Sequence, residues 1–370
     1  MKILQISNDY YNSGVYCTLH QGFLRDGLKS VFFVPLPEGV PAEPEESVIA
    51  AYCFRKNDRY WYLNKQRKVY RALRPVLETQ KPDLLHGYFL FSAGISCLWA
   101  KQEYGIPYVV TVQNTDVNTI YRYFIHLRGL GQKVLAEAAA VIFPSPAYRD
   151  YVLMHMVSRR EQAGLAGKSH VLPFAVAPFW TAHPETGMRS IHEDALRLLT
   201  VGRVDRDKNQ TTVLRAAELL TAQGLSVELS VVGETADENV QRMLEHSPIV
   251  RRVFQLPKEQ LIDEYRRADI FVLPSKHESF GLVYAEALSQ GLPVLYTAGQ
   301  GFDGQFPEGH VGYHVDAGCC ESVAEVIQTT LKEYPALQGR CSMAARRFSQ
   351  AQVCAEAERI YSGALHAGMS

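Results

Sequence analysis

Residues 274–293 read Pro-Ser-Lys-His-Glu-Ser-Phe-Gly-Leu-Val-Tyr-Ala-Glu-Ala-Leu-Ser-Gln-Gly-Leu-Pro, and this stretch decides which fold we expect for the chain. The apolar run at 270–273, directly before it, has the length of a buried strand. Gly281 offers a tight turn, and residues 282–290 predict a short helix that Gly291 can terminate. The stretch therefore predicts a strand, a polar loop and a helix in the order typical of α/β proteins.

Two carboxylates frame the predicted helix. Glu278 precedes it, and Glu286 lies four residues after Leu282, close to the face that the helix would bury. A carboxylate beside a buried face is costly unless a partner pairs with it. One interpretation is a salt bridge to a neighbouring Lys or Arg. The other is a ligand site at the strand end, where the helix N-terminus faces an anion.

The chain is long enough for two domains, and its halves differ in charge. It has 370 residues, of which 47% are hydrophobic and 21% charged, as in soluble globular proteins. Residues 1–183 carry 20 Lys and Arg against 14 Asp and Glu, whereas residues 184–370 carry 18 against 25. The first half therefore has a mild preference for anionic partners, although the net charge is only −1.

The cysteine pattern and the absence of long apolar segments predict a cytoplasmic protein. The seven cysteines form no C-x-x-C pair, and the adjacent Cys319 and Cys320 have poor geometry for an ordinary disulfide. The N-terminus has the pattern of a strand and lacks the apolar core of a signal peptide. No segment approaches the roughly 18 to 20 apolar residues that span a bilayer. We expect any membrane contact to be peripheral, on the inner face of the cytoplasmic membrane.

A glycine turn follows the first predicted strand. Residues 2–6 predict that strand, and a helix is expected at about 15–28. Gly14 stands in the polar turn between them, where backbone N–H groups can face an anion. The full G-x-G-x-x-G dinucleotide pattern is absent, so a plain tight turn is an equal alternative.

Polar side chains follow another strand of the first half. Residues 108–112 predict this strand, and Gln113 and Asp116 come directly after it. Polar groups at the carboxyl end of a strand belong to the crevice where open α/β sheets bind ligands. Gln113 and Asp116 are therefore candidates for contact with an acceptor substrate, while the alternative is a cap for the next helix.

A basic and aromatic segment covers residues 52–77. It contains eight Lys and Arg residues against one acid, Asp58, with tyrosines, Phe54 and Trp61 interleaved. This mixture suits an anionic membrane surface, where the rings lie at headgroup level. Nucleic acid is an alternative that the remainder of the chain does not favour, because it has no basic excess. A solvated helix face with a few buried rings is equally plausible.

A linker divides the chain into two series of alternating strands and helices. Residues 183–191 are rich in Pro, Gly, Thr and Ser, and the alternation restarts at 196–201. We therefore expect an α/β fold of two doubly wound, Rossmann-like domains facing a central cleft. The N-terminal domain would span 1–183 and the C-terminal domain 184–355, with a helix at about 356–370 packing back on the first domain.

Two cations follow the first strand of the second series. Arg203 and Lys208 lie in the loop before the next helix, at the same predicted sheet edge as Glu278. A guanidinium fork and a lysine point charge suit a diphosphate. Solvated surface charge is the alternative, and the shared edge favours the diphosphate.

Together these motifs resemble the signature of the retaining glycosyltransferase family 4, or glycosyl transferases group 1, which has the GT-B fold. The matching residues are Gly202-Arg203-x4-Lys208-Asn209, Pro274-Ser275, and Glu278-Ser279-Phe280-Gly281-Leu282-x3-Glu286-Ala287. The resemblance covers nearly the whole chain, strongly from about 196 to 315 and weakly in the first half.

The resemblance implies a role for each matching residue. Arg203 and Lys208 would hold the donor diphosphate, and Glu278 would contact hydroxyl groups of the donor sugar. Glu286 would hydrogen-bond the nucleotide ribose. The backbone would hold sugar and phosphate at Phe280, Gly281 and Leu282.

Three positions depart from the family pattern. Gly14 resembles the family's N-terminal glycine loop, with Ser13 in place of a second glycine. Gln113 stands where many members have a histidine near the anomeric centre, and Phe254 or a near neighbour stands where a glycine is usual before Pro257. Members of the family need no metal, so we expect no metal and no cofactor beyond the donor substrate.

The expected function is a retaining glycosyltransferase of the hexosyl type. The C-terminal domain would bind a nucleotide diphosphate sugar, most commonly a UDP-sugar in this family, and the N-terminal domain a glycan or polyprenyl-linked acceptor. Cell-surface polysaccharide, such as capsule or lipopolysaccharide, or glycolipid would be the product. Alternatives on the same fold are a non-hydrolytic sugar-nucleotide epimerase, a phosphorylase, and a catalytically inactive nucleotide-sugar-binding partner.

Overall fold

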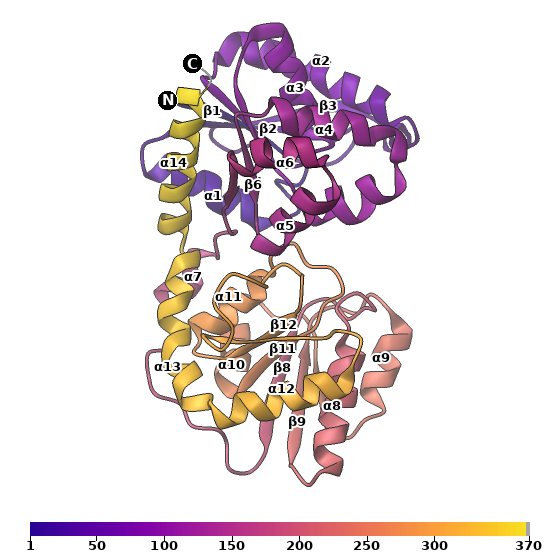
Figure 1. The fold of residues 1–370 in the computed structure, drawn as a ribbon, viewed down its shortest axis with the longest axis vertical. Coiled ribbons are helices and arrows are strands. Elements are labelled where there is room, and N and C mark those ends of the chain that lie inside the picture. Colours follow the sequence, from indigo (N-terminus) through magenta and orange to yellow (C-terminus); the bar gives the residue numbers. More distant parts are fainter. Residues whose placement is uncertain (368–370) are drawn as a thin grey trace. The chain divides into compact units, whose positions relative to one another are not determined.

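The computed structural model describes residues 1–367, which form two compact units. Unit 1 comprises Met1–Pro144, Tyr148–Ala175 and the described residues from Gln350 onward, and unit 2 comprises Ser145–Ala147 and Val176–Ser349. Each unit is built around a parallel sheet with helices on its faces (Figure 1). The predicted α/β fold with two Rossmann-like domains is confirmed.

The sheet of unit 1 has the strand order β3-β2-β1-β4-β5-β6-β7, and all neighbouring strands are parallel. Its strands are β1 (Lys2–Ile6), β2 (Lys29–Pro37), β3 (Val48–Phe54), β4 (Leu84–Gly87), β5 (Tyr108–Thr111), β6 (Ala140–Phe143) and β7 (Ser169–Val171). The order reverses between β1 and β4. In open α/β sheets, ligands bind beyond the carboxyl ends of the strands at such a switch point.

The helices of unit 1 follow the strands that they connect. They are α1 (Gly14–Arg25), η1 (Lys56–Tyr60), α2 (Tyr62–Gln80), α3 (Ala93–Tyr104), η2 (Thr115–Tyr121), η3 (Ile125–Leu127), α4 (Arg128–Glu137), α5 (Pro146–His155), α6 (Arg159–Ala166) and α14 (Gln350–Ala367). Strands β4, β5 and β6 are buried along their whole length, as apolar runs covered on both faces must be.

The sheet of unit 2 has the order β10-β9-β8-β11-β12-β13 and is also parallel. Its strands are β8 (Leu196–Val201), β9 (Val227–Val232), β10 (Val250–Val253), β11 (Ile270–Leu273), β12 (Val294–Thr297) and β13 (Gly312–Val315). The helices of unit 2 are α7 (Pro178–Ala182), α8 (Gln210–Ala222), α9 (Glu238–Glu245), α10 (Lys258–Arg267), α11 (Leu282–Ser289), α12 (Cys320–Lys332), α13 (Tyr334–Ala345) and η4 (Arg346–Phe348). Here the order reverses between β8 and β11, so the loops after these two strands meet at the switch point.

The limits of the two units differ from the predicted domain boundary at 183/184. The main segment of unit 2 begins at Val176, because helix α7 packs against α11 and the Trp180 ring lies edge-on to Tyr265 of α10, at 5.4 Å between centroids. The Pro- and Gly-rich residues 183–191 therefore lie within unit 2, after the point at which the chain crosses from unit 1, and are not the linker.

The C-terminal helix belongs to unit 1 from Gln350 onward, six residues before the predicted start at 356. Helix α14 packs on α1, where the Tyr361 ring lies 5.7 Å from the Phe23 ring. A Cβ atom at Gly22 would lie 2.5 Å from Cys354 Sγ, so this close approach requires a glycine. Residues 368–370 of the predicted helix lie outside the described residues.

The basic and aromatic segment 52–77 is not one helix. Its first residues end the edge strand β3, which the sequence did not reveal, and η1 and α2 follow. Within the part of the chain that the structure describes, no helix combines the length and the apolar composition that crossing a bilayer requires.

Candidate active site

The loops after β8 and β11 bring together two residues predicted to serve the donor. Nζ of Lys208 lies 2.5 Å from Oε2 of Glu278, and the two side chains are only 20% and 14% exposed. Strands β8 and β11 are neighbours in the sheet, so their carboxyl ends share one edge. The structure thus places the cation and the carboxylate in direct contact, while their roles toward a donor stay predictions.

An aspartate that the sequence analysis did not single out shapes the loop after β8. Oδ1 of Asp205 accepts hydrogen bonds from the N–H groups of Asp207 and Lys208, at 3.0 and 2.8 Å. Its other oxygen lies 3.3 Å from the Arg203 guanidinium, which is 66% exposed. An exposed guanidinium pair is weak, so Arg203 can exchange this carboxylate for another anion with little loss.

Two further contacts tie this loop to the loop after β11. Nδ2 of Asn209 donates to the carbonyl oxygens of Pro274 and Ala317, at 3.1 and 2.8 Å. Nδ1 of His277 lies 2.6 Å from Oδ1 of Asp207. These side chains fix the loop after β8 to the loop after β11 and, through Ala317, to the segment after β13. The sequence analysis named Asn209 as part of a motif, but the long sequence separation of the partners hid these contacts.

Helix α11 begins at the site with a glycine that the backbone requires. Gly281 has φ of +81°, and a Cβ atom there would lie 2.5 Å from the Tyr284 ring. The Phe280 side chain is fully buried and packs against Phe302 and Phe348. Phe280 can therefore offer a ligand only its backbone, and the predicted backbone contact with the donor stays a prediction. The positive end of the α11 dipole, at Leu282, favours an anion.

The loop after β12 supports Glu278 from the other side. The N–H of Gly301 donates to the Glu278 carbonyl at 2.9 Å, and Oε1 of Gln300 accepts from the Glu278 N–H at 3.2 Å. A Cβ atom at Gly301 would lie 2.6 Å from the Phe280 nitrogen. Gln300 and Gly301 are thus positioning residues that the sequence analysis did not single out.

Glu286 lies one turn into α11 and is bonded to Tyr265. The Tyr265 hydroxyl donates to Oε2 of Glu286 at 2.9 Å. Burial raises the pKa of Glu286 to about 7, although hydrogen bonds from Tyr265 and Trp180 oppose the shift. The tyrosine thus supplies a partner for the carboxylate beside the buried face, where a Lys or Arg was one expected alternative.

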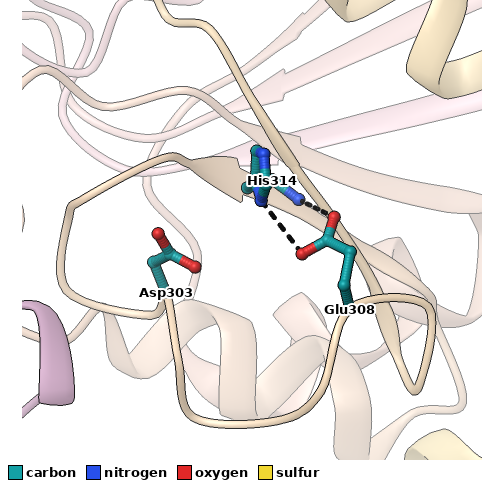
Figure 2. A group of neighbouring side chains, drawn as sticks. All are labelled: Asp303, Glu308 and His314. Carbon is teal, nitrogen blue, oxygen red and sulfur yellow. Dashed lines mark hydrogen bonds and ion pairs between the residues drawn. The ribbon is translucent and has the colours of Figure 1, made fainter.

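One group of potential metal ligands lies on β13 and on the loop that precedes it. Ligand atoms of Asp303, Glu308 and His314 all lie within 4.8 Å of one another (Figure 2). Glu308 accepts from the His314 N–H at 2.9 Å and lies 3.0 Å from its Nδ1, while Asp303 accepts from the Gly299 N–H at 2.7 Å. Because these carboxylates already brace the loop, their grouping has a structural explanation that needs no metal.

In unit 1, Gly14 starts α1 and leaves open space at the helix end. The Ser13 hydroxyl caps the helix by accepting from the Val15 N–H, and a Cβ atom at Gly14 would meet nothing within 4 Å. No packing contact in the described structure therefore demands a glycine here. The predicted anion contact of this turn stays a prediction.

Asp116, predicted to contact an acceptor, is bonded to the backbone of unit 1, and its contact with a substrate stays a prediction. Asp116 is fully buried, and its two oxygens accept from the N–H groups of Leu90, Phe91 and Gln113 at 3.0 to 3.1 Å. Burial raises its pKa to about 6, and the three backbone bonds oppose that shift. Asp116 therefore holds the loop after β4 against the start of η2, and no substrate can reach its carboxylate in this conformation.

Gln113 is also engaged within unit 1. Its Nε2 donates to the Tyr16 hydroxyl at 2.8 Å and to the Tyr88 carbonyl at 2.6 Å, and the residue is 6% exposed. A buried amide with both of these bonds positions α1 and the loop after β4. Its predicted catalytic role, near the anomeric centre, would require this arrangement to change.

A parallel Rossmann-like sheet in each unit, with a basic loop and a helix N-terminus at the switch point of unit 2, defines the class of GT-B proteins. Comparison with known families agrees. The family described as "Glycosyl transferases group 1" matches residues 188–348, and the family described as "Glycosyl transferase 4-like domain" matches residues 22–164. The chain belongs to this family, glycosyltransferase family 4.

Curated relatives and solved structures are similar over most of the chain. D-inositol 3-phosphate glycosyltransferase from Paenarthrobacter aurescens is 26% identical over 63% of this chain, and that match spans 60% of the relative's own length. Alpha-monoglucosyldiacylglycerol synthase from Streptococcus pneumoniae is 24% identical over 64% of this chain, and that match spans 57% of the relative's own length.

Two solved structures show the same fold. Sucrose-phosphate synthase from Thermosynechococcus elongatus has a TM-score of 0.77 at 20% identity, covering 99% of this chain and 100% of that one. Anabaena HepE in complex with UDP has a TM-score of 0.72 at 16% identity, covering 98% and 100%.

Proposed function

We propose that this chain is a glycosyltransferase that takes a sugar from a nucleotide diphosphate sugar held by unit 2. The observation that carries the proposal is the Lys208–Glu278 contact at the switch point, beside the N-terminus of α11. Family membership and the UDP complex of a similar structure support it. A UDP-sugar is the donor we expect, with no metal required.

The residues of unit 2 suit the departure of a diphosphate. As the anomeric C–O bond breaks, negative charge grows on the leaving group, and Lys208, Arg203 and the α11 N-terminus can stabilise it. Glu278 would then accept hydrogen bonds from sugar hydroxyls while the diphosphate leaves and the sugar that remains becomes oxocarbenium-like at its anomeric carbon. With retention, the acceptor hydroxyl attacks from the same face and its proton passes to the leaving phosphate oxygen.

For the acceptor we propose a glycan or a lipid-linked sugar bound by unit 1, as in the synthesis of a cell-surface polysaccharide or glycolipid. The relative whose name describes a diacylglycerol product supports a lipid-linked acceptor. Exposed rings directly before α2 support a peripheral membrane contact at the cytoplasmic face, since Tyr60 and Trp61 are 70% and 73% exposed. Failure of the full chain to co-sediment with anionic vesicles would contradict that contact.

A thermal-shift screen tests the donor assignment. The full chain is melted with UDP-, GDP-, ADP- and dTDP-sugars, and we expect one base to raise the melting temperature, because a ligand that binds only the folded state stabilises it by mass action. The best donor is then assayed for release of its nucleoside diphosphate with an acceptor panel. If no nucleotide sugar shifts the melting temperature, the donor assignment is wrong, and a shift with epimerised donor as the product favours the epimerase alternative.

Donor affinity is expected to rise with pH through the titration of Glu286. Its pKa is raised to about 7 in the free protein, and ribose hydroxyls donate better to the ionised form, so donor binding lowers this pKa. Affinity should therefore increase by up to about tenfold per pH unit below pH 7 and level off above it. Calorimetry with the intact nucleotide sugar measures this slope, and Glu286→Gln should abolish it. The same slope in Glu286→Gln would assign it to another group.

A further inference from the structure

One face of α2 carries a row of arginines that the donor chemistry does not use. Arg67, Tyr70, Arg71 and Arg74 are spaced i, i+3, i+4 and i+7, so they share a face of the helix. This face lines one side of an open surface hollow of about 580 Å³, and α3, which packs beside α2, lines the other side. Helix α3 contributes Trp99, Gln102 and Glu103.

The carboxylate in this hollow is already occupied. Glu103 accepts a hydrogen bond from Nε of Arg74 at 2.9 Å, with a second from the same guanidinium, and another from the Tyr70 hydroxyl at 2.8 Å. Arg67 and Arg71 are exposed, and among residues 1–367 no acidic side chain forms an ion pair with either. Two like charges one helical turn apart repel each other, and an anion bound between them would remove that cost.

The wall of the hollow is aromatic. The Trp99 ring lies edge-on to the Tyr70 ring at 5.5 Å between centroids, and both residues are only partly buried. A flat ring beside two guanidinium forks suits a phosphate group attached to a small carbon skeleton, because the forks match phosphate geometry and the ring packs on carbon. The volume lies within the range of small-molecule sites.

We propose that this hollow binds a phosphate group carried on a small polyol, with Arg67 and Arg71 donating to its oxygens and Trp99 packing on its carbons. The site lies in unit 1 and is separate from the diphosphate residues of unit 2, so it stands whether or not the donor assignment holds. The same chemistry is present in a soluble polyol phosphate and in a phosphomonoester lipid headgroup. The exposed rings directly before α2 are compatible with the lipid source.

Neighbouring charges provide matched controls for a test. Lys68 is unsuitable as a target, because its Nζ lies 2.8 Å from both oxygens of Asp58 and its charge is already balanced. Arg159 and Arg160 start α6 elsewhere in unit 1 and are exposed, so Arg159→Gln with Arg160→Gln removes the same charge without touching the hollow. Glu103→Gln removes the competing anion but keeps an acceptor for Arg74.

The first arm uses soluble sn-glycerol 3-phosphate and tryptophan fluorescence. The chain has three tryptophans, and Trp180 is 2% exposed, so a Trp61→Phe background leaves Trp99 as the one that a ligand can reach. The second arm uses vesicles of phosphatidylcholine containing phosphatidic acid, or phosphatidylglycerol at matched surface charge. Circular dichroism checks that each variant is folded.

The proposal predicts that glycerol phosphate changes the fluorescence of Trp99, that the chain binds phosphatidic acid vesicles more tightly than phosphatidylglycerol vesicles, or both. Arg67→Gln with Arg71→Gln should weaken that response at least about tenfold, the α6 pair should not, and Glu103→Gln should strengthen it. A signal in the first arm alone identifies a soluble ligand, and a preference in the second alone a lipid. No response in either arm, or an equal loss in the α6 pair, would overturn the proposal.

Discussion

Replacing Lys208 with alanine is expected to reduce sugar transfer by more than about 10²-fold, and Glu278→Ala by a similar factor, the scale for lost transition-state contacts. Lys208 would lose its charge where the leaving diphosphate becomes more negative, so kcat should fall more than the donor KM rises. Glu278→Ala would remove the sugar contact and also leave Lys208 without its partner at 2.5 Å. Initial rates of nucleoside diphosphate release, with the donor found by thermal shift, measure both effects.

The same loop supplies the control. Arg206 lies two residues before Lys208, is 74% exposed, and pairs with Asp237 at 3.0 Å. Because an exposed pair of this kind contributes little, Arg206→Ala should transfer sugar at nearly the wild-type rate. Near-normal turnover in both Lys208→Ala and Glu278→Ala would refute the donor site, and a large loss in Arg206→Ala would show that the loop tolerates no change.

Much of the donor side could be predicted because its determinants are local. The strand at 270–273 is a continuous apolar run and the strand at 196–201 a mostly apolar one, and both occur with those limits. Parallel strands place their carboxyl ends on one edge, so a cation after one strand and a carboxylate after another could be expected to meet. What the pattern could not give was the adjacency of β8 and β11, which brings residues 70 positions apart into contact.

Three features of the structure depend on contacts that local sequence patterns do not show. Strand β3 is an apolar run that is partly exposed along most of its length and pairs with β2 at the edge of the sheet, and its last residues fall within the basic and aromatic segment 52–77. The start of unit 2 at Val176 depends on Trp180 meeting Tyr265, 85 residues later in the chain. The role of Asp116 depends on backbone groups 25 and 26 residues away.

Asp116→Ala is expected to destabilise unit 1 by about 3 kcal/mol or more, because it leaves three buried N–H donors without an acceptor at about 1 kcal/mol or more each. The donors belong to Leu90, Phe91 and Gln113, and the carboxylate that they share is fully buried. No water can replace a fully buried acceptor without opening the loop. Native-state hydrogen exchange of these three amides, with the melting temperature of the chain, measures the loss.

Local exchange separates a positioning role from a general loss of stability. Asp116→Ala should speed exchange at the three amides far more than along β5, because their acceptor is gone while the strand ladder persists. Asp150→Ala removes an exposed carboxylate of unit 1 that pairs with Arg149, and should change stability by less than about 0.5 kcal/mol. If Asp116→Ala keeps the wild-type melting temperature and exchange but loses transfer, the carboxylate acts on a substrate and the structural assignment is wrong. Loss of stability with unchanged donor binding in unit 2 would instead place Asp116 entirely in the support of unit 1.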